Sequence, residues 1–196
     1  MKWMIENGTI VDGTKRPSYK GDIIVNNGEI IEIGKNLKDK KPSMDYVINA
    51  ENLIVSPGFI DTHSHSDLMI LSDKNIMPKL FQGITTEVLG QDGISMAPTP
   101  LKYVKDWRKN LSGLDGDSDK ISWKYETTKE YFEAIEERQL ISNIAYLVPH
   151  GNIRMEAVGL SDGIASSQDL EKMKEILRRE LKSGAIGLST GCLLYT

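Results

Sequence analysis

The chain has 196 residues, of which 39% are hydrophobic and 27% are charged, which is typical of a soluble globular protein and not of disordered or fibrous classes. A formal net charge of −4 without a basic stripe argues against a nucleic-acid-binding protein, and no apolar run approaches the roughly 20 residues of a membrane span. The single cysteine, Cys192, cannot form an internal disulfide, which fits a reducing compartment, and the apolar stretch at residues 3–5 is far too short for a signal peptide. We therefore expect a cytoplasmic protein.

Residues 1–56 carry short β-rich runs separated by turn residues. These runs lie at residues 3–5, 9–11, 22–25, 29–33, 46–48 and 53–55. Asn27-Gly28 stands between two of them and is typical of a hairpin turn in which both residues take positive φ. Residues 35–43 are polar and lysine-rich, which predicts an exposed loop. This part of the sequence therefore predicts a small antiparallel β-domain without catalytic groups.

From residue 57 onward, strand patterns and helix patterns alternate. We expect strands at 59–67, 84–89, 142–148 and 185–189, and helices at 76–81, 100–111, 127–139 and from Ser166 or Ser167 to Gly184. The longest helix carries one apolar face, formed by Leu170, Met173, Ile176, Leu177 and Leu181. Such alternation predicts right-handed βαβ units and a parallel sheet. Sites in such folds lie beyond the carboxyl ends of the strands.

Two of the three histidines of the chain lie in residues 57–67 (PGFIDTHSHSD). Read as a strand, this stretch places Phe59, Asp61, His63, His65 and Asp67 on one face, because successive strand side chains point to opposite sides. Two imidazoles on one face can bind a divalent metal such as zinc, with Asp61 or Asp67 as a supporting carboxylate. The alternative is an accidental pair whose rings are solvated or bonded to other protein groups.

With these motifs in place, the sequence resembles the amidohydrolase superfamily and, within it, the N-acyl-D-amino-acid deacylase (D-aminoacylase) group. The resemblance is carried by residues 7–13 (NGTIVDG), 27–34 (NGEIIEIG), 57–67, 82–90 (QGITTEVLG), 150–154 (HGNIR) and 184–191 (GAIGLSTG). It implies an α/β fold in which residues 1–56 form part of a small β-sandwich domain. Residues 57–196 would form the first four βα units of a TIM-like (β/α)₈ barrel, which is incomplete in this chain.

The resemblance implies a zinc-dependent hydrolase, with one or two zinc ions, that cleaves the amide bond of N-acyl-D-amino acids. His63 and His65 would be metal ligands. The best-known deacylases place a cysteine ligand where this chain has Asp92, and a carboxylate can also bind zinc. The alternative is that Asp92 only caps a turn. His150 and Arg154 are candidates for binding the substrate carboxylate. The alternative is that His150 is a structural histidine bonded to the backbone and that Arg154 forms a surface ion pair.

Two further departures from the family shape the expectations. Many superfamily relatives carry a metal-bridging lysine on the fourth barrel strand, where this chain has Gly187-Leu188-Ser189, which matches the deacylase group. The expected catalytic aspartate would lie beyond Thr196, so this chain alone is expected to be inactive. Its exposed barrel edge should pair with the remaining half of the barrel or with a homo-oligomer partner. An isoaspartyl dipeptidase-like hydrolase and a non-catalytic truncated fragment remain alternatives.

Overall fold

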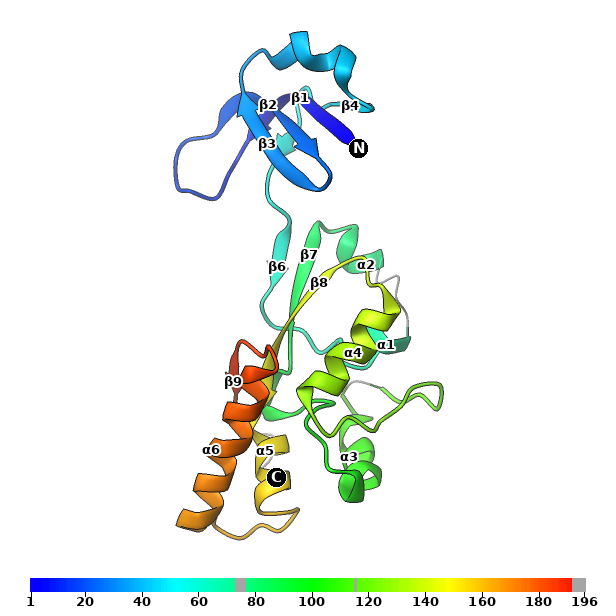
Figure 1. The fold of residues 1–196 in the computed structure, drawn as a ribbon, viewed down its shortest axis with the longest axis vertical. Coiled ribbons are helices and arrows are strands. Elements are labelled where there is room, and N and C mark those ends of the chain that lie inside the picture. Colours follow the sequence, from blue (N-terminus) through cyan, green and yellow to red (C-terminus); the bar gives the residue numbers. More distant parts are fainter. Residues whose placement is uncertain (73–76, 115, 192–196) are drawn as a thin grey trace. The chain divides into compact units, whose positions relative to one another are not determined.

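The computed structural model describes residues 1–72, 77–114 and 116–191. The chain divides into two compact units, Met1–Pro57 and Gly58–Thr196 (Figure 1). Ile76, at the start of a predicted helix, and Cys192 lie outside the described residues. Within the described ranges, none of the helices combines the length and the apolar character that crossing a membrane requires.

The first unit is a five-stranded sheet with the order β3-β2-β1-β4, in which β5 also pairs with β1. Its elements are β1 (Lys2–Ile10), β2 (Tyr19–Asn26), β3 (Glu29–Gly34), the 3₁₀ helix η1 (Leu37–Ser43), β4 (Tyr46–Asn49) and β5 (Ile54–Val55). The predicted hairpin turn is confirmed, because Asn27 and Gly28 take φ values of 51° and 86° between β2 and β3. The predicted loop at residues 35–43 contains η1, which has no buried residue.

The prediction of a purely antiparallel domain was wrong. Strands β2 and β3 are antiparallel to their neighbours, but β4 and β5 both run parallel to β1. The connection through η1 is long enough to bring the chain back in the same direction, which a hairpin cannot do. The sequence also suggested two strands where β1 is continuous. Asn7, with φ 64°, forms a bulge there, and its backbone N–H donates to Asp22 Oδ1 at 2.8 Å.

The second unit is built around a parallel sheet, as predicted, and the order of its strands is β6-β7-β8-β9 (Figure 1). Its strands are β6 (Phe59–Asp61), β7 (Ile84–Leu89), β8 (Asn143–Pro149) and β9 (Gly187–Ser189). Its helices are α1 (Met69–Ser72), α2 (Met77–Leu80), η2 (Gln91–Gly93), η3 (Leu101–Tyr103), α3 (Val104–Leu111), α4 (Thr128–Arg138), α5 (His150–Ala157) and α6 (Ser167–Lys182). Together the two units have an amidohydrolase fold, with a mixed sheet and a curled parallel half-barrel sheet.

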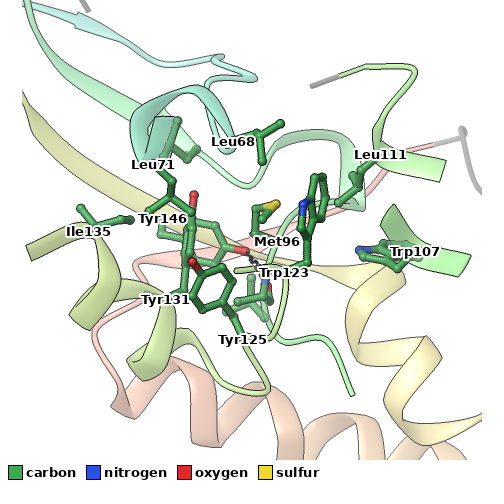
Figure 2. Packing of buried hydrophobic residues seen from close by; sticks show 14 of the residues in the cluster. Leu68, Leu71, Met96, Trp107, Leu111, Trp123, Tyr125, Tyr131, Ile135 and Tyr146 are labelled. Carbon is green, nitrogen blue, oxygen red and sulfur yellow. Dashed lines mark hydrogen bonds between the residues drawn. The ribbon is translucent and has the colours of Figure 1, made fainter. Parts of the chain in front are cut away.

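The core of the second unit is rich in aromatic side chains (Figure 2). Tyr131 of α4 lies between Tyr125 and Tyr146, with ring centroids 5.4 and 5.3 Å apart. Both buried hydroxyls are satisfied, because Tyr131 donates to the backbone oxygen of Asp67 at 2.7 Å and Tyr146 donates to that of Ala97 at 2.5 Å. These bonds tie the loops that follow β6 and β7 to the core of the unit.

Helix α6 is capped by Ser166, one of the two serines at which the helix was expected to begin. Ser166 Oγ accepts a hydrogen bond from the Asp169 backbone N–H at 3.2 Å, and the Asp169 side chain accepts one from the Ser166 N–H at 2.9 Å. The predicted apolar face is only partly covered, since Ile176 is buried whereas Leu170 and Leu181 are exposed.

Replacing Ser166 with alanine is expected to lower the free energy of unfolding by about 1 kcal/mol, because an N-terminal N–H of the helix loses its acceptor. Urea denaturation measures this change. Ser167→Ala is the matched control, since Ser167 is the first residue of the helix itself, and it should change stability by less than about 0.5 kcal/mol. Equal effects of the two substitutions would contradict the assignment of Ser166 as the cap.

Candidate metal centre

The two histidines follow β6 but do not lie on it. The strand ends at Asp61, and residues 62–68 form an irregular loop. The prediction that residues 59 to 67 form one strand was therefore wrong. Asp61 Oδ1 accepts a hydrogen bond from the backbone N–H of His63 at 3.2 Å. This bond is typical of an aspartate that turns the chain out of a strand.

The loop nevertheless brings the two imidazoles together with Asp92. The Nε2 atoms of His63 and His65 lie 3.3 and 3.1 Å from Asp92 Oδ2. The ring centroids of the two histidines are 5.4 Å apart. One donor atom from each of the three residues lies within 4.8 Å of the other two. His63 is the most accessible of them, with 60% of its side chain exposed, compared with 23% for His65.

This arrangement fits a bound divalent metal. Zinc takes imidazole nitrogen and carboxylate oxygen at about 2.0–2.2 Å, so neighbouring donors of a tetrahedral site lie roughly 3.3 Å apart. The two measured separations from Asp92 match that spacing. The donor set consists of two imidazoles and one carboxylate, which are ligand types that zinc accepts.

The backbone around Asp92 is shaped for this placement. Asp92 lies in η2 with a φ of 55°, and the flanking Gly90 and Gly93 also have positive φ, at 75° and 78°. A Cβ on Gly90 would lie 2.0 Å from the Leu147 carbonyl oxygen, and one on Gly191 would lie 2.3 Å from the Asp92 carbonyl oxygen. Close backbone packing from β8 and from the segment after β9 therefore fixes the loop that carries Asp92.

Ser189 of β9 forms hydrogen bonds to the loop that carries Asp92. Its Oγ accepts a hydrogen bond from the Gly93 N–H at 3.1 Å and donates one to the Gly90 carbonyl oxygen. The sequence identified this position only as one that lacks a bridging lysine. In the structure it connects the last strand to the Asp92 loop.

Asp67 connects the histidine loop to the loop that carries Asp92. Its carboxylate is buried, and Oδ1 accepts hydrogen bonds from the Gly90 N–H at 3.0 Å and from Ser95 Oγ. Burial raises the pKa of Asp67 to about 6, although these two hydrogen bonds and the charge of His65 oppose the rise. The two acids that were predicted to support the histidines therefore make different contacts. Asp61 accepts a hydrogen bond from the backbone of His63, whereas Asp67 connects the histidine loop to the Asp92 loop.

Reasoning from the sequence missed Lys79, a partly buried lysine close to the histidine loop. Lys79 Nζ lies 2.8 Å from Asp61 Oδ2, 2.6 Å from Ser64 Oγ and 2.5 Å from Glu87 Oε2. The hydrogen bond from Lys79 is the main reason that the pKa of Asp61 lies below its ordinary value. One signal was available in the sequence, since Glu87 interrupts an otherwise uncharged strand.

The two predicted substrate-binding residues lie on α5, directly after β8. His150 is its first residue, and burial, followed by the charge of Arg154, lowers the pKa of this imidazole. The Arg154 guanidinium donates to the carbonyl oxygens of Gly163 at 2.6 Å and Gly159 at 3.4 Å, in the segment that leads to α6. Their role in substrate binding stays a prediction.

Comparison with known proteins assigns the class. Residues 46–194 match the amidohydrolase family, and the chain belongs to that family.

Among curated proteins, the chain is 31% identical over 188 residues to D-aminoacylase from Alcaligenes xylosoxydans xylosoxydans and 35% identical over 188 residues to N-acyl-D-glutamate deacylase from the same organism. Each alignment covers 96% of this chain but only 37% and 36% of the relative. The chain thus spans about a third of the length of these curated relatives.

The fold agrees with a solved structure from the same group. N-acyl-D-glutamate deacylase from Bordetella bronchiseptica, complexed with zinc and a phosphonate inhibitor, superposes with a TM-score of 0.83 at 33% identity. The alignment covers 96% of this chain and 38% of that one.

Proposed function

We propose that this chain carries metal ligands of a zinc-dependent hydrolase that removes the acyl group from N-acyl-D-amino acids. The observation that carries the proposal is the convergence of His63 Nε2 and His65 Nε2 on Asp92 Oδ2, at 3.3 and 3.1 Å. Similarity to proteins named D-aminoacylase and N-acyl-D-glutamate deacylase supports the substrate class. Zinc in the similar Bordetella bronchiseptica structure supports the metal.

The roles of the residues follow from their chemistry. His63 and His65 would bind zinc through neutral imidazole nitrogens, and Asp92 would add an oxygen donor and a negative charge in place of a thiolate. Bound zinc can polarise an amide carbonyl and lower the pKa of a bound water. Asp67, Ser189 and the glycines around Asp92 keep the two ligand-bearing loops in register. Whether one or two ions bind depends on ligands beyond these three.

His150 and Arg154 are proposed to receive the carboxylate of the substrate. Both follow the carboxyl end of β8, the edge of a parallel sheet where ligands bind. A guanidinium can hold a carboxylate with two parallel hydrogen bonds. Arg154 would have to exchange its present carbonyl partners, Gly159 and Gly163, for the substrate.

We further propose that the parallel sheet is the first part of a TIM-like (β/α)₈ barrel and that the mixed sheet is part of a β-sandwich. The strand order β6-β7-β8-β9 follows the chain order, as in such a barrel. Large apolar side chains are exposed on the outer strands of the sheet, namely Phe59 and Ile60 on β6 and Leu188 on β9. Further strands, from the rest of the barrel or from a second copy, would cover them.

Metal analysis tests the proposal first. The purified chain is expected to bind Zn²⁺ in stoichiometric amounts, and His63→Ala is expected to abolish this binding because one of three donors is lost. Lys129→Ala, on the exposed face of α4, is the control and should bind as the unmodified chain does. Equal zinc content in both variants would contradict the assigned site.

Activity is tested on the whole protein that contains this chain. Release of acetate from N-acetyl-D-glutamate, but not from its L-enantiomer, is the expected result. Cleavage of an isoaspartyl dipeptide without deacylation would instead assign the protein to the peptidase alternative.

A further inference from the structure

A small polar cluster lies beside the stretch that carries His63 and His65. It consists of Asp61, Ser64, Lys79 and Glu87, and we call it the Lys79 cluster. The Lys79 ammonium donates to a side-chain oxygen of each of the other three residues, at 2.5 to 2.8 Å. Three elements meet at this one charge, because Asp61 ends β6, Glu87 lies on β7 and Lys79 lies on α2.

The cluster is attached to the histidine loop at two points. Ser64 stands between the two histidines, is buried, and donates to Glu87 Oε2 at 2.7 Å while it accepts from Lys79. Asp61 accepts from Lys79 with one oxygen and from the His63 backbone N–H with the other. The Lys79 ammonium is thus linked to the histidine loop through two residues, Asp61 before the first histidine and Ser64 between the two.

The charges of the cluster explain why the ammonium is needed. The carboxylates of Asp61 and Glu87 come from paired positions of β6 and β7, and the Glu87 side chain is only 1% exposed. Glu87 Oε1 has no hydrogen-bond partner among the residues that the structure describes, so the observed compensation for the buried carboxylate comes from the contacts of Oε2. Without the ammonium, two neighbouring carboxylates would repel each other and Glu87 would be a buried, uncompensated anion.

We propose that Lys79 is a positioning residue for the metal site, which holds the His63–His65 stretch in its metal-binding conformation through Ser64 and Asp61. This inference rests on the proposed function, because the residues that Lys79 would position are the proposed metal ligands. A metal-binding sequence pattern would not include Lys79, because this residue lies far from the histidines in the sequence and on a different element, α2.

Two measurements on Lys79→Met test the inference, because methionine keeps the apolar stem and removes the charge. Amide hydrogen exchange of residues 63–65 in the metal-free chain is expected to accelerate roughly tenfold, since the hydrogen bonds from Lys79 to Asp61 and Ser64 are lost. Affinity for Co²⁺ is expected to fall by about 10- to 100-fold, as for other groups that orient metal ligands. The visible Co²⁺ absorption should shift as the ligand geometry changes.

Two variants separate this role from general stability. Lys79→Arg keeps the charge and is expected to restore most of the affinity. Lys41→Met is the matched control, because Lys41 also pairs with a buried glutamate, Glu6, at 2.9 Å, but in the unit without histidines. It should leave Co²⁺ binding and exchange at residues 63–65 unchanged. If Lys79→Met does not fold, Ser64→Ala removes the central link and should change both readouts in the same direction.

The outcomes distinguish the two proposals. Unchanged exchange at residues 63–65, or unchanged Co²⁺ affinity and absorption, in Lys79→Met would overturn the positioning role. An unmodified chain that binds no Co²⁺ or Zn²⁺ would overturn the proposed metal site, while the exchange measurement would still decide whether Lys79 fixes the loop.

Discussion

Replacing Asp92 with asparagine is expected to weaken Zn²⁺ binding by roughly 100-fold, because the site loses its only charged donor among the three converging residues. Asparagine has nearly the same shape and tolerates the left-handed conformation that Asp92 adopts, with φ 55°. The fold of the loop should therefore be preserved. Isothermal titration of the metal-free chain with Zn²⁺ measures the loss, and the thermal midpoint should change little.

A second substitution at the same position tests the ligand chemistry directly. Asp92→Cys is expected to retain zinc binding and to add a thiolate-to-metal charge-transfer band when Co²⁺ is bound, because the sulfur would take the place of the carboxylate oxygen. Asp119→Asn, in the exposed loop that contacts Arg108, is the control. If Asp92→Asn binds zinc as tightly as the unmodified chain, Asp92 only shapes its turn.

The structure brings together the two imidazoles of the histidine motif, but not by the geometry that the motif predicted. Period-two alternation predicted one strand face for His63 and His65. The strand ends at Asp61, and a loop brings the two rings near Asp92 instead. The residue types and their spacing were informative because few side chains can bind zinc, whereas the local conformation depended on hydrogen bonds to Lys79 and Val88 that the pattern does not contain.

The presence of most helices and strands could be predicted from the sequence, but their ends could not. The parallel sheet of β6 to β9 followed from the alternation of strands and helices, whereas the sequence placed the start of α6 at either Ser166 or Ser167, and the structure uses Ser166 as the cap. No helix was predicted where α5 lies, since its first residues include Gly151 and Asn152, which favour loops. In the structure Asn152 is buried, and its side chain bonds Ser95, Pro98 and Thr99, so tertiary contacts override its local preference.

The supporting polar groups were the least predictable part. Ser189, Lys79 and Glu87 are separated from His63 and His65 by 14 to 126 positions in the sequence, and each is an ordinary residue type in its local segment. Their roles arise only when the strands are placed side by side, because a buried charge is recognised by its partners and not by its neighbours in sequence.

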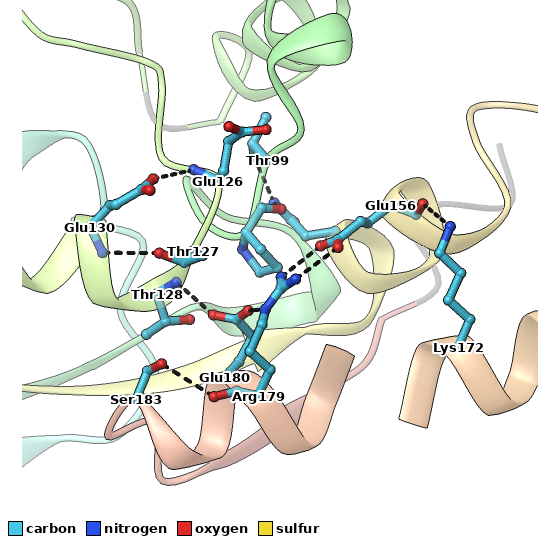
Figure 3. A network of polar contacts seen from close by, with 12 residues as sticks. Thr99, Glu126, Thr127, Thr128, Glu130, Glu156, Lys172, Arg179, Glu180 and Ser183 are labelled. Atoms are coloured by element: carbon cyan, nitrogen blue, oxygen red, sulfur yellow. Dashed lines mark hydrogen bonds and ion pairs between the residues drawn. The ribbon is translucent and has the colours of Figure 1, made fainter. Parts of the chain in front are cut away.

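The largest expected change in stability comes from the network between α4, α5 and α6 (Figure 3). Arg179 donates to both carboxylate oxygens of Glu156, at 3.0 and 2.8 Å, and its Nε donates to Glu180. Glu180 is fully buried and accepts a hydrogen bond at 2.6 Å from the backbone N–H of Thr128, at the start of α4. The bond to Glu156 is the main cause that raises the pKa of Arg179, so this guanidinium stays charged.

Arg179→Ala is expected to lower the free energy of unfolding by about 3 kcal/mol, because it leaves the Glu180 carboxylate buried without its cation. The lower end of the range for buried pairs applies, since 42% of the Arg179 side chain is exposed to solvent. Urea denaturation measures the change. Lys174→Ala, which breaks an exposed pair with Glu171, is the control and should cost less than about 1 kcal/mol.

A double substitution identifies the source of this cost. If the uncompensated charge is responsible, Glu180→Gln should recover part of the stability lost in Arg179→Ala, because the amide oxygen can still accept from the Thr128 N–H while the buried charge is removed. If the loss comes instead from missing side-chain packing of Arg179, the second substitution should add to it. A single Arg179→Ala effect no larger than that of Lys174→Ala would show that the network does not stabilise this unit.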